Sequence, residues 1–344
     1  MVCSMRKVIL SLLFISVVLP FVTVCKSKKV RRPPRKPTTQ AAKDDKKDEK
    51  KDSFVAAEPS KLDMRMTAGN IGGTYYQIAT TLNSLPGVTI SVWETNGSTE
   101  NINLVGQGKA ELALTQLDVM QNMVAANRSL GQKVKILIPL FTEEIHIIAP
   151  KTMSKIEDLK GKKVSIGPEG SGTRATSLAI LQAYGINDKS FQADGSKSKV
   201  GLDKLQKGEV DAVIIVAGAP VPMLKELDAG FGNKYHMINF RGRTYSKLRK
   251  TTGYNMARLR KKIYKWVNRP VRTISVDSAI VAKSDLSDSN VENLIQKVFD
   301  RKNFEELFLS HEKWQELNIK NIKKRLRSEP TAFHPAALKT YNAM

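Results

Sequence analysis

The feature of this chain that most constrains its fold is a glycine-rich loop that occurs twice, each time between a short apolar run and a helical pattern. The clearer copy is Gly167–Thr173, and a weaker copy, Ala68–Tyr76, precedes it. Each predicts a strand–loop–helix unit in which unpaired backbone N–H groups and the positive end of the helix dipole point outward, where an anion can bind. Two such cradles in one chain predict a ligand held between two lobes.

Short apolar runs and helical periods alternate through the rest of the chain. In its first half, strands are predicted at Met64–Ala68, Val88–Glu94, Leu112–Gln116, Val134–Phe141 and Ile145–Ala149. Helices are predicted between them, at Thr74–Leu85, from Ser98 onward, and at Asp118–Asn127. The order recurs as strand Lys163–Gly167, helix Ser171–Tyr184, helix Gly201–Lys207 and strand Val210–Val216. This is the order of an open α/β sheet, and its repetition predicts two similar lobes.

The N-terminal 25 residues predict export. Arg6 and Lys7 precede an apolar run, Val8–Val24, that is too short for a comfortable membrane span. The end of this run resembles the lipobox of bacterial lipoproteins before Cys25, although Val24 stands where a small residue is usual. Lipid attachment at Cys25 stays open beside ordinary cleavage or an uncleaved anchor. We therefore expect residues 1–25 to be a signal peptide, and the protein to be periplasmic or in the cell envelope.

Residues 26–60 are rich in Lys, Arg, Pro, Asp and Glu and have almost no large apolar side chain. Such a segment buries too little surface to offset its chain entropy, so we predict a disordered linker. Its basic half, Lys28–Lys36, is either a solvated spacer or a contact with anionic lipid headgroups. Cys3 and Cys25 are the only cysteines. The segment from residue 61 onward therefore has no disulfide, thiolate metal site or cysteine nucleophile.

The sequence lacks a recognisable catalytic constellation. Gly167–Thr173 approaches the nucleotide P-loop, but Thr173 stands where that motif has Lys. The Gly-x-Ser-x-Gly elbow and the His-Glu-x-x-His zinc helix are both missing. The four histidines are scattered singly, and the neighbours Glu143 and Glu144 are not expected to converge as acid and base. The sequence predicts a protein that is not an enzyme and has no metal site or cofactor.

Several short motifs follow one another in order from about Leu62 to the end of the chain. They are Gly72–Tyr76, Gly97–Asn101, Asp158–Lys160, Gly161–Val164, Gly170–Thr173, Val210–Ala212 and His334–Pro335. This set resembles the TAXI family, the solute-binding receptors of TRAP transporters. The resemblance implies an α/β, two-lobed periplasmic-binding-protein fold (type II, Venus-flytrap) with mixed sheets flanked by helices. Lobe 1 would comprise residues 61–149 and 275–344, and lobe 2 residues 150–274.

The same resemblance implies a function. A small organic anion, either an amino acid such as glutamate or glutamine or another carboxylate, would be enclosed between the lobes and delivered to a TRAP-type membrane permease. A ligand-sensing subunit of a signalling system stays open as an alternative use of such a receptor.

Ligand contact is predicted for residues on loops that face each other, because glycines let the backbone approach a carboxylate and hydroxyls add donors. These residues are Gly73, Thr74, Tyr75, Tyr76, Asn96, Ser98, Ser171, Gly172 and Thr173. Taken singly, each is explained equally well as part of a helix cap or a tight turn. Gln116 and Asp118 follow a strand at its carboxyl end, where open α/β sheets bind ligands. Asp118 either pairs with a ligand ammonium or caps the next helix, and Gly218 is expected on the opposite rim.

One stretch, Arg241–Arg272, departs from what a small-anion receptor needs. It is rich in Lys and Arg, has no acidic residue, and includes Tyr245, Tyr254, Tyr264 and Trp266. It is a solvated surface, a docking site for an acidic permease or an anionic membrane, or a source of positive field around the cleft. Charge interleaved with aromatic rings also fits polyanion binding. The rival hypothesis is therefore a membrane-tethered polyanion-binding or adhesion protein; nucleic acid is not expected as a partner.

Overall fold

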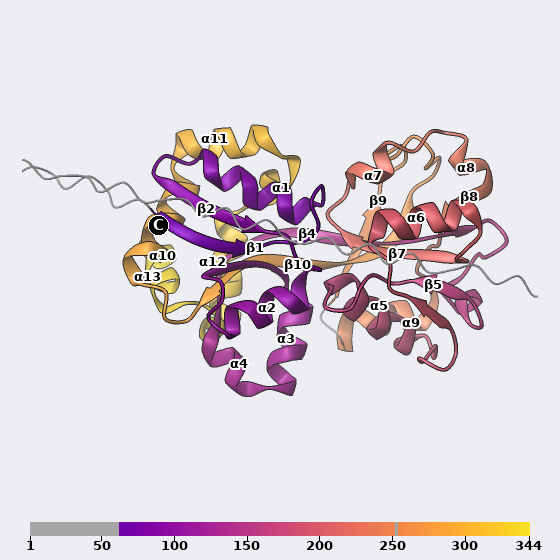
Figure 1. Ribbon diagram of the computed structural model, residues 1–344, viewed down its shortest axis with the longest axis horizontal. Helices are drawn as coiled ribbons and strands as arrows, with labels where there is room; N and C mark the ends of the chain where they lie inside the picture. Colours follow the sequence, from indigo (N-terminus) through magenta and orange to yellow (C-terminus); the bar gives the residue numbers. More distant parts are fainter. Residues whose placement is uncertain (1–61, 252–253) are drawn as a thin grey trace, which may run out of the picture. The chain divides into compact units, whose positions relative to one another are not determined.

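The computed structural model describes residues 62–251 and 254–344 (Figure 1). The predicted signal peptide, Cys25 and the predicted linker lie outside the described residues. Within the described part, none of the helices is long and apolar enough to cross a membrane.

Lobe 1 is built on three parallel strands, β1 (Leu62–Thr67), β2 (Val88–Trp93) and β3 (Leu112–Gln116), with β1 between the other two. Its helices lie on both sides of these strands (Figure 1). They are α1 (Thr74–Thr81), α2 (Ser98–Gly106), α3 (Leu117–Ala126), α4 (Arg128–Lys133), α10 (Asp288–Phe299), α11 (Arg301–Ser310), α12 (Ile319–Ser328) and α13 (Pro335–Ala343). Ser287, Asp300 and Asn318 each accept hydrogen bonds from backbone N–H groups at a helix start, which fixes where α10, α11 and α12 begin.

Lobe 2 repeats the plan with the parallel strands β5 (Lys163–Ser165), β6 (Gln192–Asp194) and β7 (Ala212–Ala217). Two further strands, β8 (Tyr235–Met237) and β9 (Asn255–Leu259), pair antiparallel with the long strands described below. The helices of this lobe are α5 (Gly172–Ala183), α6 (Ser198–Lys207), α7 (Pro222–Lys225), α8 (Phe231–Lys234) and α9 (Gly242–Thr251). Two buried clusters pack on the two faces of its sheet, and they place Ile147 and Ile148, which are adjacent on one strand, in different clusters.

Two long antiparallel strands, β4 (Val134–Pro150) and β10 (Val271–Lys283), run through both lobes and join them into one mixed sheet (Figure 1). The sequence predicted two strands where β4 is continuous, because the polar run Thr142–Glu144 interrupts the apolar pattern. That prediction was wrong, since these three residues stay paired with Ser275–Asp277 of β10. Their polar side chains take partners from other elements instead of ending the strand.

The hydrophobic cores show where the lobes divide. Phe141 belongs to the lobe 1 core and Ile145 to a lobe 2 core; on β10 the division falls between Val276 and Ala279. The register of β10 against β4 shifts between Asp277 and Ala279, a local irregularity at the crossing. The boundaries between the cores therefore lie a few residues away from the lobe boundaries expected at 149/150 and 274/275. Both lie within strands that continue through the two lobes. The predicted two-lobed α/β fold, with a mixed sheet flanked by helices, is confirmed.

Candidate functional site

A cavity of about 400 Å³ lies between the lobes, and four helices begin at its wall. From lobe 1 these are α1 and α2, and from lobe 2 they are α5 and α6. Their first residues all line the cavity: Thr74, Ser98, Gly172 and Ser198. Helix N-termini carry open N–H groups and partial positive charge, so their convergence favours an anionic group.

Two of these four helix starts are already satisfied by the protein. Ser171 Oγ accepts from the Arg174 N–H at 3.0 Å, which caps α5. In α2 the Glu100 N–H donates to the carbonyl of Gly170 in lobe 2 at 2.9 Å. Within the described part of the chain, no side chain caps α1 or α6. The helix starts left for a ligand are therefore α1 in lobe 1 and α6 in lobe 2.

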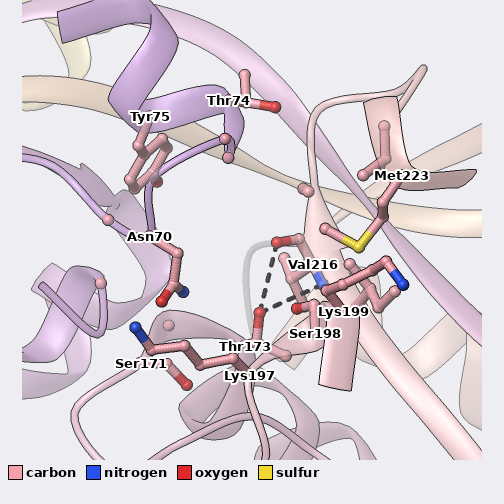
Figure 2. A pocket seen from close by; sticks show the side chains of 18 of the residues that line it. Asn70, Thr74, Tyr75, Ser171, Thr173, Lys197, Ser198, Lys199, Val216 and Met223 are labelled. Carbon is pink, nitrogen blue, oxygen red and sulfur yellow. Dashed lines mark hydrogen bonds between the residues drawn. The ribbon is translucent and has the colours of Figure 1, made fainter. Parts of the chain in front are cut away.

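Two side-chain oxygens near the start of α1 have no hydrogen-bond partner in the described part of the chain: Thr74 Oγ1 and Asn70 Oδ1. Both are buried atoms, and both residues line the cavity (Figure 2). Thr74 is only 5% exposed. Buried polar groups are nearly always hydrogen-bonded, so this unpaired pair at the cavity wall is open to partners from a molecule in the cavity.

Close backbone approach brings the loops of the two lobes together beneath the cavity. A Cβ atom added to Gly172 would lie 1.7 Å from Gln116 Oε1 and 2.6 Å from Ser98 Oγ. Gly97 has a φ of +125°, which a residue with a side chain rarely adopts, and it faces the same loop. Gln116 Nε2 in turn donates to Thr176 Oγ1 of α5 at 2.9 Å. Lobe 1 and lobe 2 are thus in direct contact through glycine and amide groups.

The charged groups at the cavity belong to both lobes. Lys197 Nζ donates to Glu94 Oε1 at 2.9 Å, an ion pair that joins α6 of lobe 2 to the loop after β2 in lobe 1. The hydrogen bond from Lys197 lowers the pKa of the Glu94 carboxyl. Lys199 and Glu226 also line the cavity. Positive and negative side chains are therefore both within reach of a bound molecule.

A buried carboxyl, Glu143, forms part of the cavity wall at the crossing of β4. The Tyr75 hydroxyl donates to Glu143 Oε2 at 2.8 Å. Burial raises the pKa of Glu143 to about 8, against the opposing effect of that hydrogen bond. Glu143 is therefore largely protonated at neutral pH in this arrangement. Its neighbour Glu144 points the other way, accepting from the Ala219 N–H at 2.8 Å and pairing with Lys313 at 3.6 Å.

Of the twelve predicted ligand residues, the structure brings nine to this cavity: Gly73, Thr74, Tyr75, Asn96, Ser98, Gln116, Ser171, Gly172 and Thr173. Tyr76 packs against the lobe 1 core instead. Gly218 lies against the side chain of Lys313 on another side of the crossing strands. Asp118 is buried between the lobes, where its Oδ2 accepts from Thr176 Oγ1 at 2.8 Å, and burial raises its pKa. These three residues are outside the cavity wall.

Sequence reasoning missed several lining residues. Lys197, Ser198 and Lys199 were missed because α6 begins at Ser198, three residues before the predicted helix start. Glu143 was considered only as half of an adjacent acid pair. Asn70 lies within the weaker glycine loop, and its position two residues before the Gly-Gly pair was the available signal.

An apolar surface completes the cavity. Val216, Val221, Pro222 and Met223 line it from lobe 2, and Ile71 and Val200, which are 66% and 48% exposed, line it as well. In Figure 2, Met223 and Val216 lie across the cavity from Asn70 and Thr74. The cavity wall therefore offers both hydrogen bonds and apolar contact.

Comparison with known proteins gives a family. The model of the NMT1-like family matches residues 66–343. The chain belongs to the NMT1-like family. The motif resemblance predicted the TAXI family, and since the matched model is a different one, that finer assignment stays a prediction.

Solved structures similar to this NMT1-like protein share little sequence with it. The aliphatic sulphonate-binding protein SsuA of Escherichia coli is 17% identical, with a TM-score of 0.44, covering 83% of this chain and 84% of its own. PhnD1 of Prochlorococcus marinus, in complex with methylphosphonate, is 10% identical, with a TM-score of 0.47 and coverage of 79% and 100%. The GluR0 ligand-binding core of Nostoc punctiforme, in complex with L-glutamate, is 15% identical, with a TM-score of 0.42 and coverage of 71% and 97%.

Proposed function

We propose that this NMT1-like protein is a non-catalytic extracytoplasmic receptor that encloses a small organic anion between its lobes and delivers it to a membrane permease. One observation carries the proposal: two uncapped helix starts, α1 and α6, face one cavity from opposite lobes, beside the unpaired oxygens of Thr74 and Asn70. A carboxylate would accept from the open N–H groups and from the Thr74 hydroxyl.

The rest of the wall supports a ligand with both polar and apolar parts. Val216, Val221 and Met223 offer contact to a short apolar segment, while Glu226 offers an acceptor to an ammonium group. An amino acid meets both requirements, and a plain carboxylate meets the first. We therefore propose amino acids and small carboxylates as the ligand class.

Closure of the lobes is part of the proposal. The hinge would be the crossing of β4 and β10, where the cores divide. The contacts made on closure would be Glu94–Lys197, Gln116–Thr176 and Glu100–Gly170, which all join lobe 1 to lobe 2. A bound ligand that touches both lobes would favour the closed arrangement, which a permease would then recognise.

The permease type and the membrane tether rest on the sequence alone. TRAP-type delivery follows from the motif resemblance, and an envelope location, with or without a lipid at Cys25, follows from the leader. Both are tested in the native organism. Deleting the genes of the TRAP-type permease should abolish uptake of the ligand, and Cys25→Ala should release the protein from membranes if Cys25 is acylated.

The aromatic side chains on which the rival polyanion-binding hypothesis depends are not accessible at the surface. Tyr245, Tyr254, Tyr264 and Trp266 are all buried, at 7%, 2%, 1% and 5% exposure. They pack inside lobe 2 and offer no stacking surface to bases. The burial of these four rings therefore gives the polyanion-binding alternative no support, and the charges of the stretch are its remaining basis.

The decisive experiment is a thermal-shift screen of the full chain against amino acids, monocarboxylates and dicarboxylates, followed by calorimetry on the hits. At 100 times the dissociation constant, a ligand that binds only the folded state should add about 2.7 kcal/mol of stability. Thr74→Val should remove most of the shift. If none of these acids raises the melting temperature, or if Thr74→Val leaves the shift unchanged, the proposed site is wrong.

A further inference from the structure

Lobe 2 has a second cavity, of about 350 Å³, which shares no lining residue with the cavity between the lobes. It lies where β8, the end of β4 and the segment leading into β10 meet. Its wall includes Lys151, Arg241 and Arg269, together with the polar side chains of Ser154, Asn239 and Asn268. We call this cavity the lobe 2 basic pocket.

The charge of the basic pocket is not balanced by acids. No Asp or Glu lines it, and none of the ion pairs among the described residues involves Lys151, Arg241 or Arg269. A carboxylate close in sequence, Asp158, accepts from the N–H groups of Ser154 and Lys155. Three cations therefore surround a concave surface with no internal counter-charge.

The base of the pocket is apolar and rigid. Trp266 and Val271 line it and are each 5% exposed, and Met237 is 3% exposed. Trp266 is fixed by a hydrogen bond from Nε1 to the Leu224 carbonyl at 3.0 Å and by packing against the ring of Phe231. Charges held above such a low-dielectric surface attract an anion more strongly than the same charges on an open face.

Neutral donors add to the cations. Asn239 Oδ1 accepts from the Arg272 N–H at 2.8 Å, which leaves the Asn239 amide NH₂ as a donor. Two arginine forks, one ammonium and side-chain amide groups match an anion that has several acceptor oxygens and more than one charge. We propose that the lobe 2 basic pocket binds a doubly charged tetrahedral oxyanion, either free phosphate or the phosphate of a phosphomonoester. The site is independent of the ligand proposed for the cavity between the lobes.

The test is calorimetric titration of the full chain with inorganic phosphate at low ionic strength. The double variant Arg241→Ala/Arg269→Ala should weaken binding about tenfold or more, because each arginine supplies charge-assisted hydrogen bonds. The matched control is Arg258→Ala/Arg260→Ala, which removes two exposed cations of the same basic stretch that lie outside the pocket. The control should bind phosphate like the wild type.

The alternative outcomes separate the site from a general effect of net charge. Absence of saturable phosphate binding, or equal weakening in both double variants, overturns the proposal. Loss of phosphate binding in Thr74→Val with full binding in Arg241→Ala/Arg269→Ala would place the phosphate in the cavity between the lobes, and would also overturn it. Failure here leaves the receptor proposal intact, since that depends on organic acids and Thr74.

A second arm distinguishes the source of the phosphate. The full chain is mixed with phosphatidylcholine vesicles that contain or lack phosphatidic acid, and sedimentation is measured. Recruitment by phosphatidic acid that is competed by free phosphate and lost in Arg241→Ala/Arg269→Ala supports a lipid phosphate as ligand. Saturable phosphate binding without recruitment supports a soluble phosphate compound.

Discussion

The two glycine loops of this chain differ in how many of their side-chain hydrogen-bonding groups have partners within the protein. In the second loop, Ser171 Oγ donates to the Pro168 carbonyl at 2.7 Å and accepts from the Arg174 N–H, so its hydroxyl proton is already committed within the loop. In the first loop, Thr74 Oγ1 and Asn70 Oδ1 are buried and have no partner within residues 62–251 and 254–344. The loop with the clearer motif thus serves mainly to build its own helix start. The loop with the weaker motif keeps donors and acceptors available, so the clearer motif does not mark the loop with more free polar groups.

The largest expected effect concerns Glu143, whose carboxyl accepts a hydrogen bond from Tyr75 next to the first loop. The folded-state pKa of Glu143 is about 8, above its ordinary value of 4.5. Between these pH values the folded protein binds more protons than the unfolded chain, so stability should fall as pH rises through this window. Relative to Glu143→Gln, which keeps an acceptor for Tyr75, the wild type should lose up to about 5 kcal/mol over this window. Denaturant unfolding at a series of pH values measures the difference.

The control for this pH dependence is Glu169→Gln, which removes an exposed acid of the second loop and should follow the wild-type curve. Comparison with Glu143→Gln also cancels the contribution of His146, whose pKa burial lowers to about 4 and which changes stability in the opposite sense at low pH. Parallel curves for wild type and Glu143→Gln would show that Glu143 is ionised throughout.

Gly172→Ala tests whether close approach of the second loop is needed for closure. The added Cβ would overlap Gln116 Oε1, and the side chain of Gln116 is held by the hydrogen bond from its Nε2 to Thr176 Oγ1, so the lobes should be kept apart. Ligand affinity is expected to fall about a hundredfold, or roughly 3 kcal/mol, with little change in the stability of the unliganded protein. Gly195→Ala, where the nearest atom to an added Cβ is 3.9 Å away, is the matched control. Small-angle scattering that shows ligand-induced compaction in Gly172→Ala would contradict this role.

Much of the fold was predictable because its signals are local. Alternating apolar patterns gave most strands, and glycine followed by Ser or Thr gave the starts of α1 and α5. The missed features depend on partners distant in sequence. The polar run Thr142–Glu144 continues a strand because Tyr75 and Lys313 supply partners from other elements. The role of Lys197 depends on Glu94, on the facing lobe. No local pattern encodes such pairings.

Thr74→Val tests whether the Thr74 hydroxyl contributes to ligand binding or to the stability of the fold. Valine has the shape of threonine, so the change removes an unpaired hydroxyl and should leave stability unchanged or slightly higher. Ligand affinity should fall by about 1.5–3 kcal/mol, the typical value of a hydrogen bond to a charged group. Thr67→Val is the matched control, since Thr67 Oγ1 is also buried and unpaired but lies outside the cavity. Equal affinities for Thr74→Val and Thr67→Val would remove Thr74 from the site.

Ser171→Ala should show the reverse pattern. It removes the cap of α5 and should cost about 1 kcal/mol of stability, with a smaller change in ligand affinity than Thr74→Val. Ser287→Ala, which removes the cap of α10 far from the cavity, should destabilise the protein by a similar amount. A loss of affinity in Ser171→Ala as large as that in Thr74→Val would mean that both loops bind the ligand directly, and the contrast between them would fail.

The smallest expected effect is that of Lys197→Gln. This variant decides whether Lys197, at the start of α6, contacts the ligand or only forms an ion pair with Glu94 of lobe 1. The Glu94–Lys197 pair is 39% and 49% exposed, so by itself it should contribute at most about 1 kcal/mol. If Lys197 acts through Glu94, the two single variants and the double variant Glu94→Gln/Lys197→Gln should all weaken ligand binding by the same amount. Added salt should then reduce the difference in ligand affinity between these variants and the wild type. If Lys197 instead contacts the anion, Lys197→Gln should weaken binding further in the Glu94→Gln background. In that case the start of α6 supplies a lobe 2 contact to the ligand.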